Sequence, residues 1–126
     1  MNNSPLFSWV EIACSDLDRA TKFYEQMLGL ELIPVDMDNG LRMRMFPDSE
    51  ALTSGALCHR PNHYQPSLNG TLIYFNANPN LQIYLERIVQ AGGEILQEKT
   101  MISPEHGYMA IFKDSEGNRM ALHSIS

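Results

Sequence analysis

The sequence has little cysteine, no long apolar run and no run of basic residues. Its two cysteines, Cys14 and Cys58, are too few for a disulfide scaffold and are typical of a reducing, cytoplasmic compartment. No stretch of about eighteen apolar residues could cross a membrane, and Met1 to Pro5 lacks the features of a signal peptide. A formal net charge of −6 without a compensating basic run argues against nucleic acid as a partner.

Several common catalytic patterns are absent as well. The sequence contains no Ser-His-Asp order, no phosphate-binding glycine loop and no dinucleotide-binding fingerprint. What remains is an ordinary globular composition, with 44% hydrophobic and 19% charged residues over 126 positions. This length suits one domain with a sizeable core.

An internal repeat organises the chain. Trp9–Leu32 and Thr71–Ile95 each contain a β-prone run, an Asp/Asn cluster, an amphipathic helix, a glycine stop and a new strand. After each unit the chain resumes in a similar way, since Phe46-Pro47-Asp48-Ser49-Glu50 matches Phe112-Lys113-Asp114-Ser115-Glu116. We therefore predict a single domain, 1–126, made of two βαβββ repeats.

The repeats are predicted to span about 7–60 and 70–125, with a linker at 61–69 that is rich in polar residues and proline. The predicted strands lie at about 7–14, 30–36, 41–46, 55–60, 71–77, 94–101, 107–113 and 119–125.

Both helices carry recognisable ends. In the first, Asp16 is the expected N-cap and Gly29 the expected stop. In the second, Asn78 is the expected cap, Pro79 takes the first helical position, and Gly92-Gly93 end the helix. The apolar stripes of the two helices consist of Leu17, Ala20, Phe23, Tyr24, Met27 and Leu28, and of Leu81, Leu85, Ile88 and Val89.

Short motifs in both repeats carry a family resemblance. They are Asp16-Leu17-Asp18-Arg19-Ala20, Phe23-Tyr24 and Leu28-Gly29-Leu30 in the first repeat, and Ala91-Gly92-Gly93, Phe112-Lys113-Asp114 and Glu116-Gly117-Asn118-Arg119 in the second. From Phe7 to Ser124 the chain resembles the vicinal oxygen chelate superfamily, which includes glyoxalase I, bleomycin resistance proteins, fosfomycin resistance enzymes and extradiol dioxygenases. The resemblance implies an α+β fold in which two βαβββ repeats form a rolled eight-stranded mixed sheet around a cavity. It also implies a homodimer, which often completes the cavity.

The resemblance places four metal-ligand positions at Trp9, Thr71, Ala121, and either Ala56 or Leu57. Indole and alkyl side chains offer no donor atom to a metal, and a neutral threonine hydroxyl is a poor one. We therefore expect no metal and no other cofactor.

One alternative keeps a metal in the predicted cavity. If the register is shifted by two residues, Glu11 and His123, joined by His59, would form a divalent metal site.

The candidate site residues follow from the predicted cavity face. Trp9 could stack on a flat ligand, or it could fill a cavity that binds nothing. Glu11 and His123 are the candidate catalytic residues for proton transfer. The alternatives are an internal ion pair of Glu11 with Arg119 or His123, and a histidine that is only hydrogen-bonded in the core or at the rim. The complete predicted ligand-binding set is Trp9, Glu11, Thr71, Tyr108 and His123.

Three functions are compatible with these residues. The first is a metal-independent protein of the bleomycin resistance type, which binds a small organic ligand in the cavity. The second is a lyase or isomerase that uses Glu11 or His123 for proton transfer and depends on a metal only if the shifted site exists. The third is a regulatory subunit with a filled cavity, which binds a partner through its surface.

Overall fold

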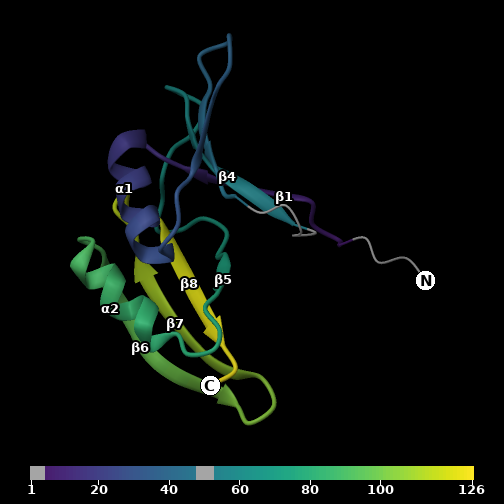
Figure 1. Cartoon of the computed structure of the whole chain (residues 1–126), viewed down its shortest axis with the longest axis vertical. Coiled ribbons are helices and arrows are strands. Elements are labelled where there is room, and N and C mark those ends of the chain that lie inside the picture. Colours follow the sequence, from purple (N-terminus) through teal and green to yellow (C-terminus); the bar gives the residue numbers. More distant parts are fainter. Residues whose placement is uncertain (1–4, 48–52) are drawn as a thin grey trace.

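The computed structural model describes residues 5–47 and 53–126, in which two helices and eight strands follow the order βαβββ twice (Figure 1). The elements are β1 (Trp9–Ala13), α1 (Leu17–Leu28), β2 (Ile33–Asp36), β3 (Arg42–Met45), β4 (Ser54–His59), β5 (Tyr74–Asn76), α2 (Gln82–Gln90), β6 (Glu94–Ser103), β7 (Gly107–Lys113) and β8 (Arg119–Ser124). The predicted α+β class with two βαβββ units is confirmed. No helix in the described ranges is long and apolar enough to span a membrane.

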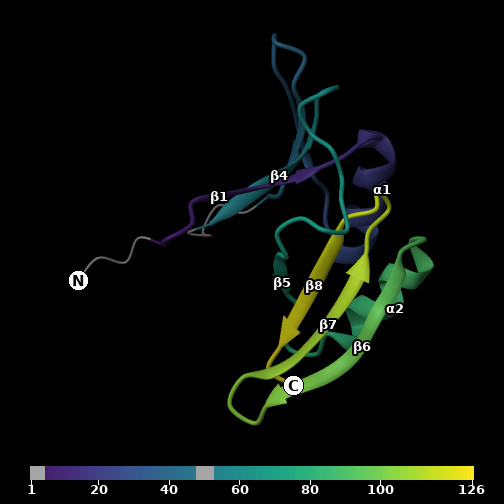
Figure 2. The same ribbon diagram turned by 180° about the vertical axis from the view of Figure 1, so that it is seen from behind.

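The strands form two four-stranded mixed sheets, ordered β1-β4-β3-β2 and β5-β8-β7-β6. In each sheet the first and last strands of the repeat pair in parallel, and the other pairs are antiparallel. Figure 2 shows the same arrangement from behind: β1 and β4 extend away from the second sheet, with the N-terminal segment at their far end.

An aromatic cluster joins the two repeats. The Phe23 and Tyr24 rings of α1 contact Phe112 and Phe75 of the second sheet, with ring centroids 6.2 Å and 5.7 Å apart. Phe46, which follows β3, completes the cluster at 6.2 Å from Phe75. Because these rings are buried or partly buried, one hydrophobic core serves both repeats.

Both predicted ends of α1 are confirmed. Asp16 is the N-cap, and its Oδ1 accepts a hydrogen bond from the Arg19 backbone N–H at 3.0 Å. Gly29 follows the helix with φ of 69°, the left-handed conformation that glycine adopts without steric cost. The predicted apolar face is buried except for Leu28, which is partly buried.

The predicted start of α2 is wrong. The helix begins at Gln82, after a cis Asn78–Pro79 peptide bond, so neither Asn78 nor Pro79 takes its predicted helical role. The C-terminal residues use this segment instead: Ile125 N–H donates to Asn78 Oδ1 at 2.7 Å, and Ser126 N–H donates to the Pro79 carbonyl at 3.1 Å. These tertiary hydrogen bonds override the local helix-start pattern.

The predicted apolar face of α2 is also partly wrong. Leu81, Leu85 and Ile88 are buried, but the side chain of Val89 is 60% exposed. The predicted stop is correct, since Gly92 has φ of 95° and follows the last helical turn directly.

Several strand bounds differ from the prediction; β2, for example, begins at Ile33, three residues later than expected. The fifth strand begins at Tyr74, so Thr71 lies in the connection before it. Strand β6 continues to Ser103 and contains register shifts against β7. Of the matched motifs, Asp48-Ser49-Glu50 lies outside the described residues, so the structure gives only the second copy of this turn.

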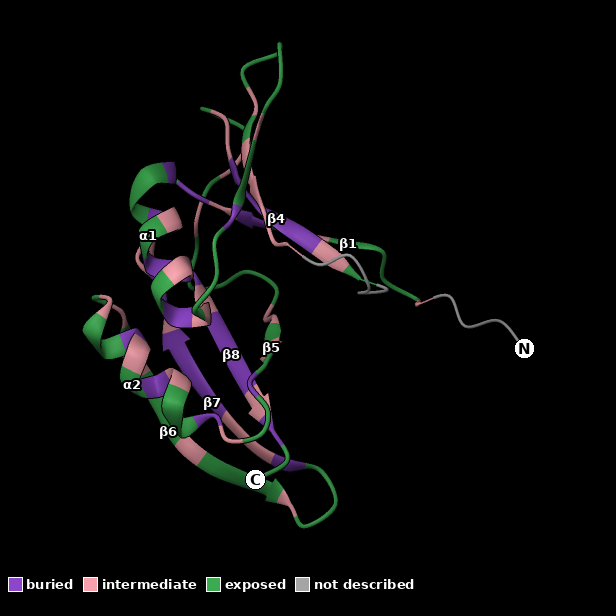
Figure 3. Cartoon of the chain, in the orientation of Figure 1, coloured by how far each residue is buried: buried purple, intermediate pink, exposed green. Residues whose placement is uncertain are grey.

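The two sheets differ in burial. Figure 3 shows most of β7 and β8 as buried, whereas β2, β3 and the start of β1 are exposed or intermediate. The first sheet therefore presents an accessible face to solvent, and the second contributes more of the packed interior.

Candidate ligand-binding site

The alternation of side chains along β1 separates the core from an exposed face. Ile12 is buried in the hydrophobic core, whereas Glu11 is exposed and lies on the opposite face together with Trp9. The parallel ladder pairs Glu11 with Ala56 of β4, and Ala56 pairs with Met45 of β3. Paired residues share a face, so a carboxylate stands beside an apolar surface.

Two aromatic side chains hold the Glu11 carboxylate. The Trp9 indole Nε1–H donates to Oε2 at 3.1 Å, and the Tyr64 hydroxyl donates to Oε1 at 2.7 Å. The hydrogen bond to Glu11 is the main reason that the pKa of Tyr64 is raised to about 12. Neither Arg119 nor His123 forms the alternative ion pair with Glu11 in the described part of the chain.

Cys58 lies next to this carboxylate. Burial, followed by the charge of Glu11, raises the pKa of the Cys58 thiol to about 12. The pKa of Cys14 is raised too, chiefly by burial. Both cysteines are free and remain protonated at neutral pH, which gives them no nucleophilic character.

A cavity of about 250 Å³ opens beside Glu11, where the connection between the repeats passes β1 and the start of β8. It is lined by Glu11, Ile12 and Ala13 of β1, by Gln65, Ser67, Gly70, Thr71 and Ile73 of the connection, and by Asn118, Arg119 and Met120. Two predicted site residues, Glu11 and Thr71, therefore line one cavity, and Trp9 is hydrogen-bonded to one of them, Glu11.

Asn118 fixes the wall of the cavity. Its Nδ2 donates to the Ala13 carbonyl at 2.8 Å, and its Oδ1 accepts from the Ser67 backbone N–H at 3.0 Å. The Arg119 backbone N–H donates to the Ser67 carbonyl at 3.4 Å. One buried amide thus connects the first strand of repeat one, the linker and the last strand of repeat two.

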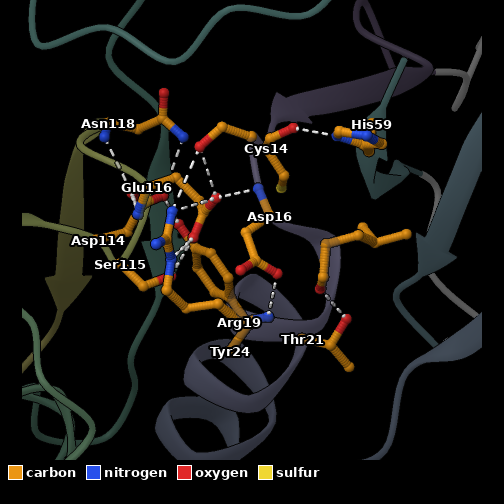
Figure 4. A network of polar contacts seen from close by, with 12 residues as sticks. Cys14, Asp16, Arg19, Thr21, Tyr24, His59, Asp114, Ser115, Glu116 and Asn118 are labelled. Carbon is orange, nitrogen blue, oxygen red and sulfur yellow. Dashed lines mark hydrogen bonds and ion pairs between the residues drawn. The ribbon is translucent and has the colours of Figure 1, made fainter. Parts of the chain in front are cut away.

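Asn118 also belongs to a buried polar network, which Figure 4 shows from close by. Asp114 accepts hydrogen bonds from the Tyr24 hydroxyl at 2.6 Å and from Asn118 Nδ2 at 3.0 Å. Glu116 accepts from the Asp16 backbone N–H at 2.7 Å and from Arg19 Nε at 2.8 Å. The turn between β7 and β8 is thereby bonded to the start of α1.

The pKa values of Tyr24 and Glu116 are shifted in this network. Burial raises the pKa of Tyr24 well above its ordinary value, and the neighbouring Asp114 charge adds to the effect. For Glu116, burial opposes ionisation, but the hydrogen bonds from Arg19, the Asp16 backbone and Ser115 together lower its pKa.

The other predicted ligand-binding residues lie apart from the cavity. Tyr108 packs against the hydrophobic core, with the Lys99 ammonium 4.5 Å from its ring centroid. His123 pairs with Asn76 and Met109 in the second sheet, and its Nε2 donates to the His106 carbonyl at 2.6 Å. The structure therefore brings Trp9, Glu11 and Thr71 together but not Tyr108 and His123.

The metal-ligand positions contain no suitable donor set. Ala56 and Ala121 are fully buried alkyl side chains, and Trp9 uses its only polar atom to bind Glu11. His59 lies on the face opposite Glu11 and donates through Nδ1 to the Cys14 carbonyl at 2.9 Å. Within residues 5–47 and 53–126, no three His, Cys, Asp or Glu side chains are placed to hold one ion. These residues do not fit the metal that the fold family implies.

The ladders also define which positions of the two repeats correspond. Glu11 pairs with Ala56 in the first sheet, and Tyr74 pairs with Ala121 in the second. If Ala56 is equivalent to Ala121, then Trp9 is equivalent to Leu72. Thr71, with which the sequence comparison aligned Trp9, lies one residue earlier.

Sequence reasoning missed Tyr64 and Gln65, because the linker has no periodic pattern from which their orientation could be read. Asn118 stood within a recognised motif, but its bonds to Ala13 and Ser67 depend on tertiary structure.

Comparison with known proteins identifies the fold family. The family model of the Glyoxalase/Bleomycin resistance protein/Dioxygenase superfamily matches residues 6–122. The chain belongs to this superfamily. No curated protein matches it significantly.

Several solved structures share the fold. TnmS3, an antibiotic binding protein from Streptomyces sp. CB03234, is 22% identical with a TM-score of 0.71, and the match covers 100% of both chains. UcmS2 is 26% identical with a TM-score of 0.71, again over 100% of both chains. Glyoxalase I from Zea mays is 20% identical with a TM-score of 0.70, and the match covers 93% of this chain and 45% of that one. This chain thus corresponds to about half of the plant enzyme.

Proposed function

We propose that this protein binds a small organic ligand in the cavity at Glu11 and Thr71, without a metal. The observation that supports this most directly is the cavity itself, which is walled by a carboxylate whose two oxygens are oriented by Trp9 and Tyr64. An indole and a phenol beside an apolar sheet face favour a ligand with a flat ring system.

The structural relatives support a binding role. TnmS3, which matches along its whole length, is described as an antibiotic binding protein. At this level of identity the likeness establishes the fold, and the binding function for this chain rests on the cavity.

The exposed N-terminal segment supports the expected homodimer. Leu6 and Phe7 are 91% and 71% exposed, and Trp9 follows them at 41%. Such an apolar arm is costly to leave in water, so we propose that a second copy covers it. At about 250 Å³ the cavity is also smaller than most ligand sites, which favours its completion by the partner. Light scattering coupled to size exclusion should give twice the monomer mass, and a monomer at all concentrations would contradict this part of the proposal.

The binding proposal is tested by thermal-shift and calorimetric titration of the purified protein with a panel of aromatic antibiotics. A true ligand should raise the unfolding temperature with concentration. Thr71→Val and Glu11→Gln should weaken binding without loss of fold, whereas Glu105→Gln in the exposed β6–β7 turn is a matched control. Chemical analysis of the ligand after incubation in the same mixtures detects any turnover by Glu11 or His123.

Metal content is measured on the same preparation. Stoichiometric zinc or nickel that is required for binding would contradict a metal-independent site. The two free, buried thiols fit the proposed cytoplasmic location, because neither depends on an oxidising compartment.

A further inference from the structure

We propose that Arg119 is the anion-binding residue of the cavity and that the ligand carries an oxyanion, such as a carboxylate, on an aromatic ring. This inference rests on the proposed function, because it assigns the chemistry of the ligand in the same cavity. It adds a specificity-determining residue that lies outside the predicted site.

The first support is the unpaired charge of Arg119. The ion pairs in the described part of the chain are formed by Arg19, Arg42, Arg44 and Lys113. Arg119 is half-buried and lines the cavity, yet no carboxylate in that part lies within 4.0 Å of it and its guanidinium donates no hydrogen bond there. A partly desolvated guanidinium without an acceptor is costly, and an oxyanion can accept two parallel hydrogen bonds from it.

The second support is the set of neutral donors beside it. Gln65 and Thr71 line the same cavity, and within the described ranges neither side chain forms a hydrogen bond to protein. An amide and a hydroxyl next to a guanidinium are a suitable set for the remaining lone pairs of a carboxylate.

The third support is the arrangement of charge. Glu11 lines the cavity too, but it is held by Trp9 and Tyr64 and lies more than 4.0 Å from Arg119. An anionic group is therefore attracted to the Arg119 wall and repelled from the Glu11 wall, which fixes the direction of the ligand. The aromatic part is then expected on the side of Trp9.

The backbone of Arg119 is held in place before a ligand binds. Its backbone N–H bonds to the Ser67 carbonyl, and the preceding Asn118 is anchored to Ala13 and Asp114. The backbone at Arg119 therefore has little freedom to lose on binding, and the ordering cost is confined to its side chain.

The test compares three probes that share one ring: 2-naphthoate, 2-naphthamide and 2-naphthylmethylamine, which are anionic, neutral and cationic. Titration calorimetry should rank the anion first. Arg119→Gln should weaken 2-naphthoate binding by at least about tenfold and change 2-naphthamide binding by less than about twofold. Arg119→Lys should retain part of the affinity for the anion because it keeps the charge.

Arg60→Gln is the control for net charge, since Arg60 does not line the cavity. It should leave the binding of all three probes unchanged. Unfolding curves of each variant establish that the fold is kept, and chemical shifts of labelled protein should change at Thr71 and Gly70.

The outcomes separate the two proposals. The Arg119 inference is overturned if 2-naphthoate does not bind, if it binds no better than 2-naphthamide, or if Arg119→Gln and Arg60→Gln have equal effects. The proposed function survives each of these results if a member of the antibiotic panel binds and Glu11→Gln or Thr71→Val weakens it. If no panel member binds in the cavity, the proposed function fails.

Discussion

The two repeats share one topology but differ in the burial of their strands and in the side chains that they expose. Repeat two contributes most of the buried strand residues, among them Ala110, Phe112 and Leu122. Repeat one places Trp9 and Glu11 on an exposed face of β1. The comparison indicates that the second repeat contributes more of the buried strand core, whereas both repeats contribute polar residues to the candidate site, Glu11 from the first and Asn118 and Arg119 from the second.

The turn between β7 and β8 joins the two repeats. It belongs to repeat two, yet Asp114, Glu116 and Asn118 bond to Tyr24, Asp16 and Ala13 of repeat one. Substitutions in this turn should therefore measure how much the contact between the two repeats contributes to the free energy of unfolding.

The largest effect is expected for Asp114→Ala. The buried carboxylate accepts hydrogen bonds from the Tyr24 hydroxyl, from the backbone N–H groups of Glu116 and Asn118, and from Asn118 Nδ2. Leaving these donors without an acceptor should lower the free energy of unfolding by about 3 kcal/mol. Urea unfolding measures this, with Asp38→Ala in an exposed turn as control. Equal effects of the two substitutions would show that the turn does not join the repeats.

A smaller, pH-dependent effect is expected for Glu116→Gln. The substitution removes the charge that Arg19 and the start of α1 bind, and should cost about 1–2 kcal/mol at neutral pH. Since Arg19 is 52% exposed and screened by solvent, we expect the lower part of this range.

The sign of the pH dependence follows from the lowered pKa of Glu116. A carboxylate whose folded pKa lies below its ordinary value of 4.5 stabilises the protein above pH 4.5. This contribution is lost as the pH falls through the lowered pKa. Urea unfolding across this range should show the two proteins converging in acid. A difference that grows in acid would contradict the assignment, and Glu94→Gln, at an exposed ion pair, should show little pH dependence.

Part of this fold could be predicted from local sequence patterns. The two ends of α1 are an example, because residues next to the helix determine both. Asp16 caps through its own side chain, and Gly29 needs only its left-handed backbone. Strand alternation likewise placed Trp9 and Glu11 on one face. The start of α2 was mispredicted because hydrogen bonds from the C-terminal residues determine the course of Asn78 and Pro79.

The candidate site was less predictable, because its cavity forms between segments distant in sequence. Tyr64 reaches Glu11 only after the linker folds back, and Asn118 holds the linker there. Tyr108 was assigned to the cavity, but it packs against the hydrophobic core, as does Ala110 two residues later on the same strand. Alternation alone gives two faces and does not say which one a strand turns toward the helices.

The helix starts offer a further test of the difference between the repeats. Asp16→Ala removes the side-chain acceptor for the Arg19 backbone N–H and should lower the free energy of unfolding by about 1 kcal/mol. Thermal or urea unfolding checks this value. An unchanged stability would mean that Glu116, which accepts from the Asp16 backbone, suffices to hold the start of α1.

The smallest effect is expected at the corresponding place in repeat two. Asn80 Oδ1 accepts from the Gln82 backbone N–H at 3.0 Å and from Lys99 Nζ at 2.9 Å, but the N-cap residue of α2, Leu81, makes no side-chain cap hydrogen bond. The start of α2 is anchored by the buried Leu81, whose N–H donates to Ser124 Oγ at 3.0 Å. Asn80→Ala should therefore change stability by less than about 0.5 kcal/mol in the same unfolding experiment. A loss as large as that of Asp16→Ala would mean that both repeats start their helices by side-chain capping, and that the C-terminal strand only reinforces the second.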